Sequence, residues 1–249
     1  MPDPQPAPRF HQRAAKMSEL VARQVVEDIV EQGLPTGAAL PTEAQMLQAY
    51  GVSRGTLREA LRILENNGLV RVRPGRGGGP VVGAARPHTF GRTLALFLQM
   101  DRTPFGELVE ARLIMEPMMA RLAAERRDPA RLRELAESMR EHQSLEGRDE
   151  RDYLPVLQRF HGVLAGVSGN GVLDLFGRAL TEIYTERIVA AERRPERWVE
   201  VRQEHQAVAE AIVAGDGALA EELMRAHMVA LVAHLDRDYA GLRDEIVGW

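Results

Sequence analysis

The sequence predicts a mainly α-helical protein in two parts, with a small β element at the end of the first part. Apolar residues recur at helical spacing through most of the 249 residues. One short segment, 69–73, alternates apolar and basic residues, as a half-buried strand does. The net charge changes from +3 over residues 1–86 to −7 over residues 87–249, which favours a nucleic acid as partner for the first part only.

Two short helices joined by a glycine turn are expected between residues 42 and 67. Thr42 follows Pro41 and begins the first helix, which ends at Tyr50-Gly51. Ser53 is suited to cap the second helix. The second helix has one apolar face, made by Leu57, Ala60, Leu61 and Leu64. Two helices in this arrangement form a helix-turn-helix.

The strand expected at 69–73 is followed by a glycine-rich turn at 74–79 and by a partner strand at 80–82. Together they make a two-stranded wing that carries Arg71, Arg73 and Arg76. Residues 54–76 hold six arginines against two glutamates. Such a concentrated basic stripe is what the neutralisation of DNA phosphates requires.

Two other interpretations of this region are weaker. A basic helical hairpin can be merely a solvated surface. The glycines at 75–79 suggest a phosphate-binding loop, but the Gly-Lys-Ser/Thr ending is missing and Pro80 breaks the GxGxxG spacing.

At these residues the chain resembles the GntR family of bacterial transcription regulators, in the motifs 40-LPTE-43, 51-GVSRGTLREAL-61 and 68-GLV-70 and over roughly residues 17–83. The resemblance implies that four residues of the second helix face the DNA major groove: Arg54, Gly55, Thr56 and Arg58. It implies further that Gly75 and Arg76 on the wing reach the minor groove, with Arg73 beside them. Arg54 and Arg58 are the expected base readers, since arginine pairs bidentately with guanine. Ala44 departs from the family pattern, so we expect one contact from the first helix to be missing.

The second part of the chain is expected to be an antiparallel bundle of six or seven helices. Each start can be named from a capping residue or a proline, and the starts are Thr103-Pro104, Asp128-Pro129, Asp152, Asn170, Pro195 and Asp216. The expected boundaries are a disordered lead-in at 1–12, a DNA-binding domain at 13–83, a linker at 84–92 and a helical domain at 93–245.

Three expected helices carry a histidine inside their apolar stripe, and these are His161, His205 and His227. A single inward histidine is usually an ordinary core residue. Three on separate helices of one bundle favour a metal site, because the neutral imidazole is the commonest metal ligand. Nothing in the sequence favours metal binding by the other four histidines, which are His11, His88, His142 and His234. His234 does lie seven residues after His227 on the same helix face.

Arg112 and Glu116 interrupt the apolar stripe of the first bundle helix. A buried guanidinium needs an anionic partner. The pair is therefore either a structural salt bridge or a site in which Arg112 binds a ligand carboxylate and Glu116 orients it.

This part resembles the FCD ligand-binding domain of the FadR subfamily. The matching motifs are 112-RLIME-116, 160-FH-161, 168-SGN-170, 204-EH-205 and 224-MRAHM-228. The resemblance implies a divalent metal, held by the three histidines and an aspartate four residues before the first of them. Leu157 stands at the aspartate position, so zinc, the expected metal, should be held more weakly, or the site is metal-free and binds the effector directly. The expected effector residues are Arg112, Glu116 and Asn170.

The sequence thus favours a regulator, expected to be a repressor, that binds a palindromic operator as a homodimer and responds to a small carboxylate. The alternative is a metal-dependent enzyme using the histidines, which is disfavoured because no nucleophile or carboxylate accompanies them at a catalytic spacing. The absence of cysteine excludes disulfides and thiolate metal ligands but does not indicate a compartment. With no apolar run long enough for a membrane and no signal peptide, we expect a cytoplasmic protein.

Overall fold

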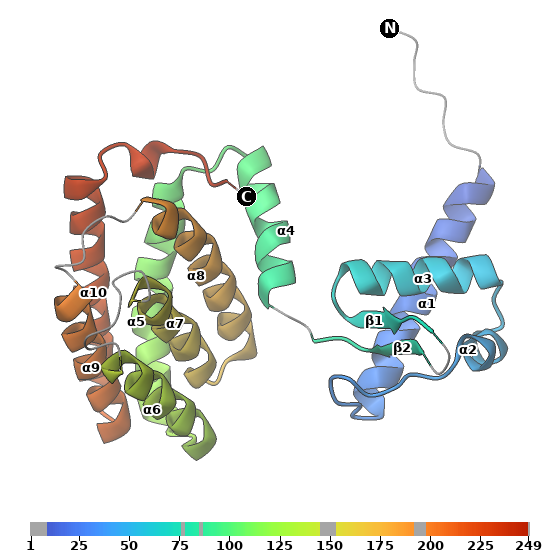
Figure 1. Ribbon diagram of the computed structural model, residues 1–249, viewed down its shortest axis with the longest axis horizontal. Helices are drawn as coiled ribbons and strands as arrows, with labels where there is room; N and C mark the ends of the chain where they lie inside the picture. The colour runs from blue at the N-terminus through green and yellow to red at the C-terminus, as the bar shows by residue number, and fades with distance from the viewer. Residues whose placement is uncertain (1–8, 76–77, 85–86, 145–152, 192–197, 249) are drawn as a thin grey trace, which may run out of the picture. The chain divides into compact units, whose positions relative to one another are not determined.

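The structure is a computed structural model that describes residues 9–75, 78–84, 87–144, 153–191 and 198–248. The chain divides into two compact units, residues 1–89 and 90–249, each with its own hydrophobic core (Figure 1). Helices dominate both units, and the described residues contain one two-stranded sheet, in the first unit. The predicted fold class, a winged helix-turn-helix followed by an α-helical bundle, is confirmed.

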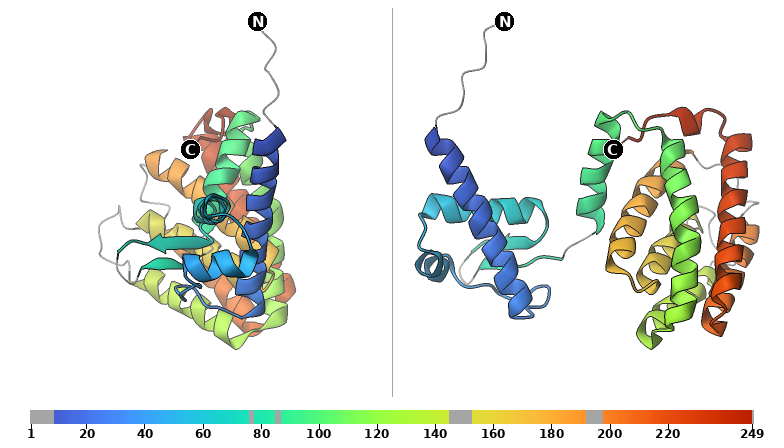
Figure 2. Two further views of the ribbon diagram at one scale, coloured as in Figure 1. Left: turned by 90° about the vertical axis from the view of Figure 1, so that its right-hand side faces the viewer. Right: turned by 180° about the vertical axis from the view of Figure 1, so that it is seen from behind.

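The first unit is built from a long helix, two short helices and a β-hairpin. In chain order these are α1 (Arg9–Glu31), α2 (Glu43–Tyr50), α3 (Arg54–Asn66), β1 (Val70–Arg73) and β2 (Gly79–Val82). Helix α1 runs across the unit and packs against α3 (Figure 2). The small core of this unit takes side chains from all three helices and both strands. It includes Val21, Val25, Met46, Leu57, Leu64, Val70 and Val82.

Side-chain caps fix the ends of the two short helices. Thr42 forms a capping box with Gln45 at the start of α2, which satisfies N–H groups that the first turn leaves open. Gly51 ends α2 in the left-handed conformation, with φ of 63°, where glycine meets no Cβ penalty. Ser53 caps α3 by accepting from the Thr56 N–H. These caps set the turn that positions α3.

The wing is less buried than its sequence pattern predicted. Strands β1 and β2 pair antiparallel, with Val70 opposite Val82 and Arg73 opposite Gly79. Val70 is buried, but Val72, expected to face inward, is 43% exposed. The small core ends at Val70 and Val82, so the hairpin extends beyond it.

The second unit is a bundle of α4 (Pro87–Met100), α5 (Phe105–Arg126), α6 (Pro129–Gln143), α7 (Tyr153–Val167), α8 (Gly171–Ala191), α9 (Trp198–Ala214) and α10 (Gly217–Asp238), followed by a 3-10 turn at Leu242–Asp244. Helix α5 is the central helix, because it contacts α7, α8, α9 and α10. Helices α5 and α10 lie side by side (Figure 2). Helix α7 packs between α6 and α8, and α9 contacts α10, α5, α6 and α7. None of the helices in the described ranges has an apolar stretch that could cross a membrane.

Some expected boundaries differ from the structure. Helix α1 begins at Arg9, inside the expected lead-in at 1–12, and α4 begins at Pro87, inside the expected linker at 84–92. Proline suits a first helical turn, where its missing N–H costs nothing, and Leu94, Ala95 and Leu98 then pack α4 onto the bundle core.

The expected helix starts are found where the structure describes them. Asp128 and Asp216 cap α6 and α10 through their side chains, whereas Pro104 precedes α5 without a side-chain cap. Asp152 and Pro195 lie outside the described residues.

Candidate DNA-binding surface and histidine site

The exposed side of α3 carries the residues expected to read DNA. Arg54, Gly55 and Arg58 are exposed and Thr56 is half-buried. The hydroxyls of Ser53 and Thr56 lie 2.9 Å apart, so the Thr56 side chain is already tied to the cap at the helix start. The helix cap and the residues expected to read bases therefore share the first turn of α3.

Acidic neighbours hold two of the α3 arginines. Arg58 donates from Nε to Glu43 Oε1 of α2 over 3.1 Å. Arg62 donates to both carboxylate oxygens of Glu59, over 2.9 and 2.6 Å. Arg62 thus uses both Nε and Nη2 to bind Glu59 within α3, whereas Arg58 binds Glu43 through Nε.

On the wing, Arg71, Arg73 and Gly75 are exposed. Arg76, expected to reach the minor groove, lies outside the described residues.

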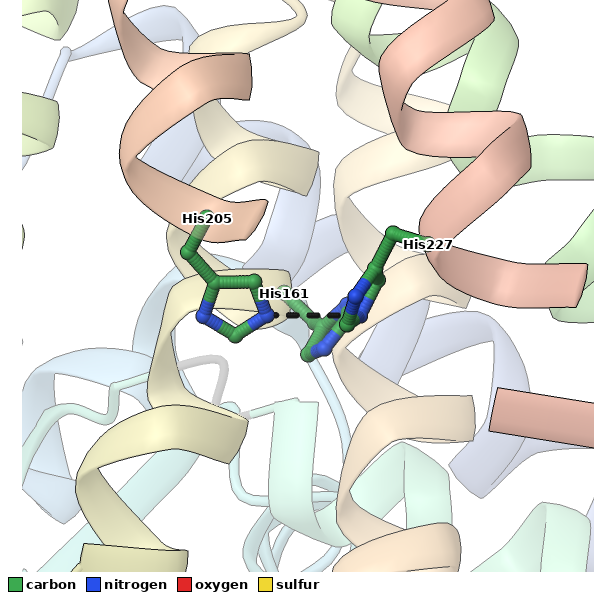
Figure 3. A group of neighbouring side chains, drawn as sticks. All are labelled: His161, His205 and His227. Atoms are coloured by element: carbon green, nitrogen blue, oxygen red, sulfur yellow. Dashed lines mark hydrogen bonds between the residues drawn. The ribbon is translucent and has the colours of Figure 1, made fainter. Parts of the chain in front are cut away.

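In the bundle, His161 of α7, His205 of α9 and His227 of α10 meet in the interior and are at most 3% exposed. One ring nitrogen from each lies within 4.8 Å of the others, and Figure 3 shows the rings converging. The Nε2 atoms of His205 and His227 are 3.3 Å apart, and Phe160 stacks on the His205 ring at a centroid distance of 4.1 Å. The structure therefore brings together the three histidines expected to bind a metal.

Each of these rings has a hydrogen-bond partner at Nδ1. His161 Nδ1 lies 2.5 Å from Glu116 Oε2, and His227 Nδ1 lies 2.6 Å from Glu204 Oε2. His205 Nδ1 lies 3.1 Å from Nε2 of a fourth histidine, His142. With Nδ1 occupied, each ring has Nε2 left for the cluster.

The buried charges favour ionised glutamate beside neutral imidazoles. Burial opposes ionisation of Glu116, but the charge of Arg112 and the bonds from Arg112 and His161 outweigh it and lower its pKa to about 2. Burial lowers the pKa of His161 to about 4, although Glu116 opposes this shift. Burial, with the charges of His227 and His161, lowers the pKa of His205 well below its ordinary value. At neutral pH these two rings are therefore neutral, the form that binds metals.

The three imidazoles could hold a metal ion, and one pair of their nitrogens has the separation that zinc requires. Two nitrogens each about 2.0–2.1 Å from tetrahedral zinc are about 3.3 Å apart, and the two Nε2 atoms of His205 and His227 have that separation. Metal-binding histidines also commonly donate their other N–H to a carboxylate or a similar acceptor, as Glu116 and Glu204 provide here.

Arg112 lies next to this cluster and is 1% exposed. Its Nε donates to Glu116 Oε1 over 2.5 Å, and its guanidinium carbon lies 4.3 Å from the centre of the Tyr184 ring. Within the described part of the chain, Nη1 and Nη2 of Arg112 have no hydrogen-bond partner. The salt bridge expected as one alternative is formed, yet it leaves two buried donors open.

Two further positions bear on the site. Leu157 is 2% exposed, one turn before His161, so no carboxylate comes from that position. Asn170 accepts from the N–H groups of Val172 and Leu173 and so caps α8. It follows Ser168, whose carbonyl oxygen accepts from Arg126 near the end of α5. Arg112 lies about 21 Å away along the same helix, so the structure does not bring Asn170 together with Arg112.

Sequence reasoning missed two of the side chains around the histidines. Glu204 stands next to His205 in the chain but contacts His227. His142, for which no role was expected, is fully buried. A signal for it exists: Leu135, Ser138, Met139 and His142 recur at helical spacing and are all buried.

Comparison with known proteins places both parts of the chain. Residues 17–78 match the model for bacterial regulatory proteins of the gntR family, and residues 107–230 match the FCD domain. The chain is 32% identical to the HTH-type transcriptional regulator Mce2R of Mycobacterium tuberculosis, over 80% of this chain and 82% of that protein. It is also 32% identical to an Escherichia coli protein named for regulation of the L-lactate dehydrogenase operon, over 86% and 84% of the two chains.

A solved structure, the GntR protein of Streptococcus agalactiae, shares the fold with a TM-score of 0.66 at 24% identity, covering 86% of this chain and 98% of that one. The two matched domains and the two relatives together identify the family of this chain. The chain belongs to the GntR family of bacterial transcription regulators, as a DNA-binding regulator of the FadR subfamily with a C-terminal FCD domain.

Proposed function

We propose that this regulator is a repressor that binds a palindromic operator as a homodimer and responds to a small carboxylate in the bundle. The observation that carries the effector proposal is Arg112, a buried guanidinium with two nitrogens that lack hydrogen-bond partners within the described residues. The proposed DNA-binding domain is 13–83 and the proposed effector domain is 93–245.

The chemistry of Arg112 favours a carboxylate. A buried donor without a partner costs about 1–3 kcal/mol, and more when it is charged. Because Glu116 occupies Nε, Nη1 and Nη2 remain as a planar pair of donors. A carboxylate matches such a pair bidentately, and the name of the L-lactate operon relative points to the same ligand class.

We further propose that His161, His205 and His227 hold a divalent metal, with zinc as the best fit to three imidazoles. The metal would supply a Lewis-acidic position for an effector oxygen. Glu116 and Glu204 bring negative charge beside the ligands, which partly offsets the missing carboxylate at Leu157. Both carboxylates are engaged by imidazoles, so they orient the rings rather than act as free general bases.

The homodimer is proposed from operator symmetry and from the bundle surface. Helix-turn-helix proteins commonly bind two half-sites as symmetric dimers. Large apolar side chains are exposed on the bundle, and a dimer interface that covered them would remove their apolar surface from water. They include Phe97, Met100, Ile114 and Val172.

Calorimetric titration with acetate, L-lactate and citrate tests the effector proposal. We expect at least one to bind and weaken operator binding, and Arg112→Ala to lose both effects while still binding operator. Arg121→Ala is the matched control, because Arg121 forms an i,i+4 pair with Glu125 on the exposed side of the same helix. Equal carboxylate binding by the Arg112→Ala and Arg121→Ala proteins would contradict the role of Arg112.

A further inference from the structure

His142 connects the histidine cluster to the backbone of α6. This fourth histidine is fully buried. Its Nδ1 lies 2.8 Å from the carbonyl oxygen of Ser138, and its Nε2 lies 3.1 Å from Nδ1 of His205. The two contacts form a chain from a backbone carbonyl, through one imidazole, to a second imidazole in the cluster.

The direction of the hydrogen bonds in this chain is determined at its first link. A carbonyl oxygen only accepts, so Nδ1 of His142 must carry a proton and donate it to Ser138. A neutral imidazole has one N–H and one lone pair, so Nε2 of His142 is an acceptor. The Nδ1 of His205 must then be the donor, which leaves the lone pair of His205 on Nε2, the atom 3.3 Å from Nε2 of His227.

We propose that His142 is a positioning residue for the metal site, because it holds His205 in the tautomer whose Nε2 lone pair faces His161 and His227. This inference rests on the proposed metal site and deepens it. It assigns to His142 a role that the carboxylates Glu116 and Glu204 perform for the other two rings.

A neutral partner for His205 also limits the charge near the site. Glu116 and Glu204 each place a carboxylate on an imidazole N–H, whereas His142 gives the third imidazole an acceptor without adding a buried negative charge. Burial of a further carboxylate would itself cost free energy. Phe160, stacked on His205, restricts rotation of the ring, so the hydrogen bond selects the tautomer and packing holds its plane.

Two variants of His142 separate a role in packing from a role in positioning His205. His142→Phe keeps an aromatic ring in the packed position but removes the acceptor for His205. His142→Gln keeps an acceptor, because the amide oxygen can take the place of Nε2. His234→Phe is the matched control, since His234 is also buried and its Nδ1 lies 2.8 Å from Asp238 Oδ2.

The first measurement uses metal-free full-length protein with ¹⁵N-labelled histidine. Long-range proton–nitrogen spectra distinguish a ring nitrogen that carries a proton from one that does not. We expect His205 to be protonated at Nδ1 in the wild type and in the Gln variant, and to lose this preference in the Phe variant. A wild-type His205 protonated at Nε2 overturns the proposal without any need for a variant to fold.

The second measurement is zinc affinity by competition with a chromophoric chelator, using zinc alone as the probe. We expect His142→Phe to bind zinc about 10- to 100-fold more weakly, and His142→Gln and His234→Phe to stay within a few fold of the wild type. Zinc binding by His142→Phe as tight as wild type overturns the proposal. If the spectra follow expectation but the wild type binds no zinc, the tautomer role is supported and the proposed metal site fails.

Discussion

Glu43 on α2 accepts a hydrogen bond from Nε of Arg58 on α3, over 3.1 Å. Both side chains are at the surface, with the Arg58 side chain 72% exposed, so the pair adds little to stability. We expect the pair to act instead on the orientation of the Arg58 guanidinium. With Nε held by Glu43, the terminal nitrogens of Arg58 remain available for a guanine edge.

The first prediction is that Arg58 contributes to base recognition. Arg58→Ala should weaken binding to the cognate operator by about 1–3 kcal/mol and relax specificity at one base pair. Fluorescence anisotropy with operator and scrambled DNA measures both effects. Arg62→Ala serves as the control, because Glu59 already engages that side chain; an equal loss in both variants would contradict base reading by Arg58.

A second prediction concerns Glu43 itself. If Glu43 orients Arg58, Glu43→Gln should weaken specific binding, although removal of a negative charge near DNA should strengthen non-specific binding. The effect of Glu43→Gln should vanish when Arg58 is already alanine, which a double-mutant cycle measures. Additive effects of the two substitutions would show that Glu43 acts independently of Arg58.

The third prediction is a dimer in solution that binds a two-fold symmetric operator. Light scattering coupled to size-exclusion chromatography should give twice the chain mass of 27.7 kDa at micromolar concentration. Footprinting should protect two half-sites. A monomer both alone and on DNA would argue against the proposed assembly.

The sequence predicted the helix ends better than the partners of the buried side chains. Caps act within a few residues, so Thr42, Ser53, Asp128 and Asp216 could be identified from local sequence and are caps in the structure. Periodicity showed that three histidines face inward, but not what they contact. The partner of His205 is His142, which is 63 residues away on another helix, and no local pattern determines how α6 and α9 pack.

The wing illustrates the same limit. Alternation predicted that Val70 and Val72 share a buried face, but burial depends on how far the core extends. Only Val70 is part of the hydrophobic core of the first unit, whereas Val72 is exposed. The start of α4 within the expected linker is a further case, because its apolar residues are identified as core only by the bundle against which they pack.

The fourth prediction is a loss of stability in mild acid. Burial places the folded-state pKa of His161 at about 4, below its ordinary 6.5, and lowers the pKa of His205 and His142 as well. A depressed histidine pKa means that the unfolded chain takes up protons first, so stability present above pH 6.5 is lost as the pH falls towards 4. The slope should be up to about 1.4 kcal/mol per pH unit for each such histidine.

Urea denaturation of metal-free protein between pH 7.5 and 5 measures this slope. His161→Leu should reduce it. Glu116, whose pKa is lowered to about 2, adds a further loss only below about pH 4.5. Unchanged stability between pH 7 and 5 would contradict neutral buried imidazoles.

The last prediction is that zinc stabilises the bundle and that Leu157 limits its affinity. Zinc that binds only the folded chain raises its melting temperature, and removal of zinc by a chelator should lower it again. Leu157 is buried one turn before His161, so Leu157→Asp should place a carboxylate beside the imidazoles. We expect this variant to bind zinc more tightly than the wild type but to be less stable without metal, because the new carboxylate is then buried without a cation. Leu157→Asn is the matched control: it is similar in size but lacks the charge. Calorimetry with and without zinc compares the three proteins, and a zinc-dependent rise in melting temperature no larger for Leu157→Asp than for Leu157→Asn would show that position 157 does not face the metal.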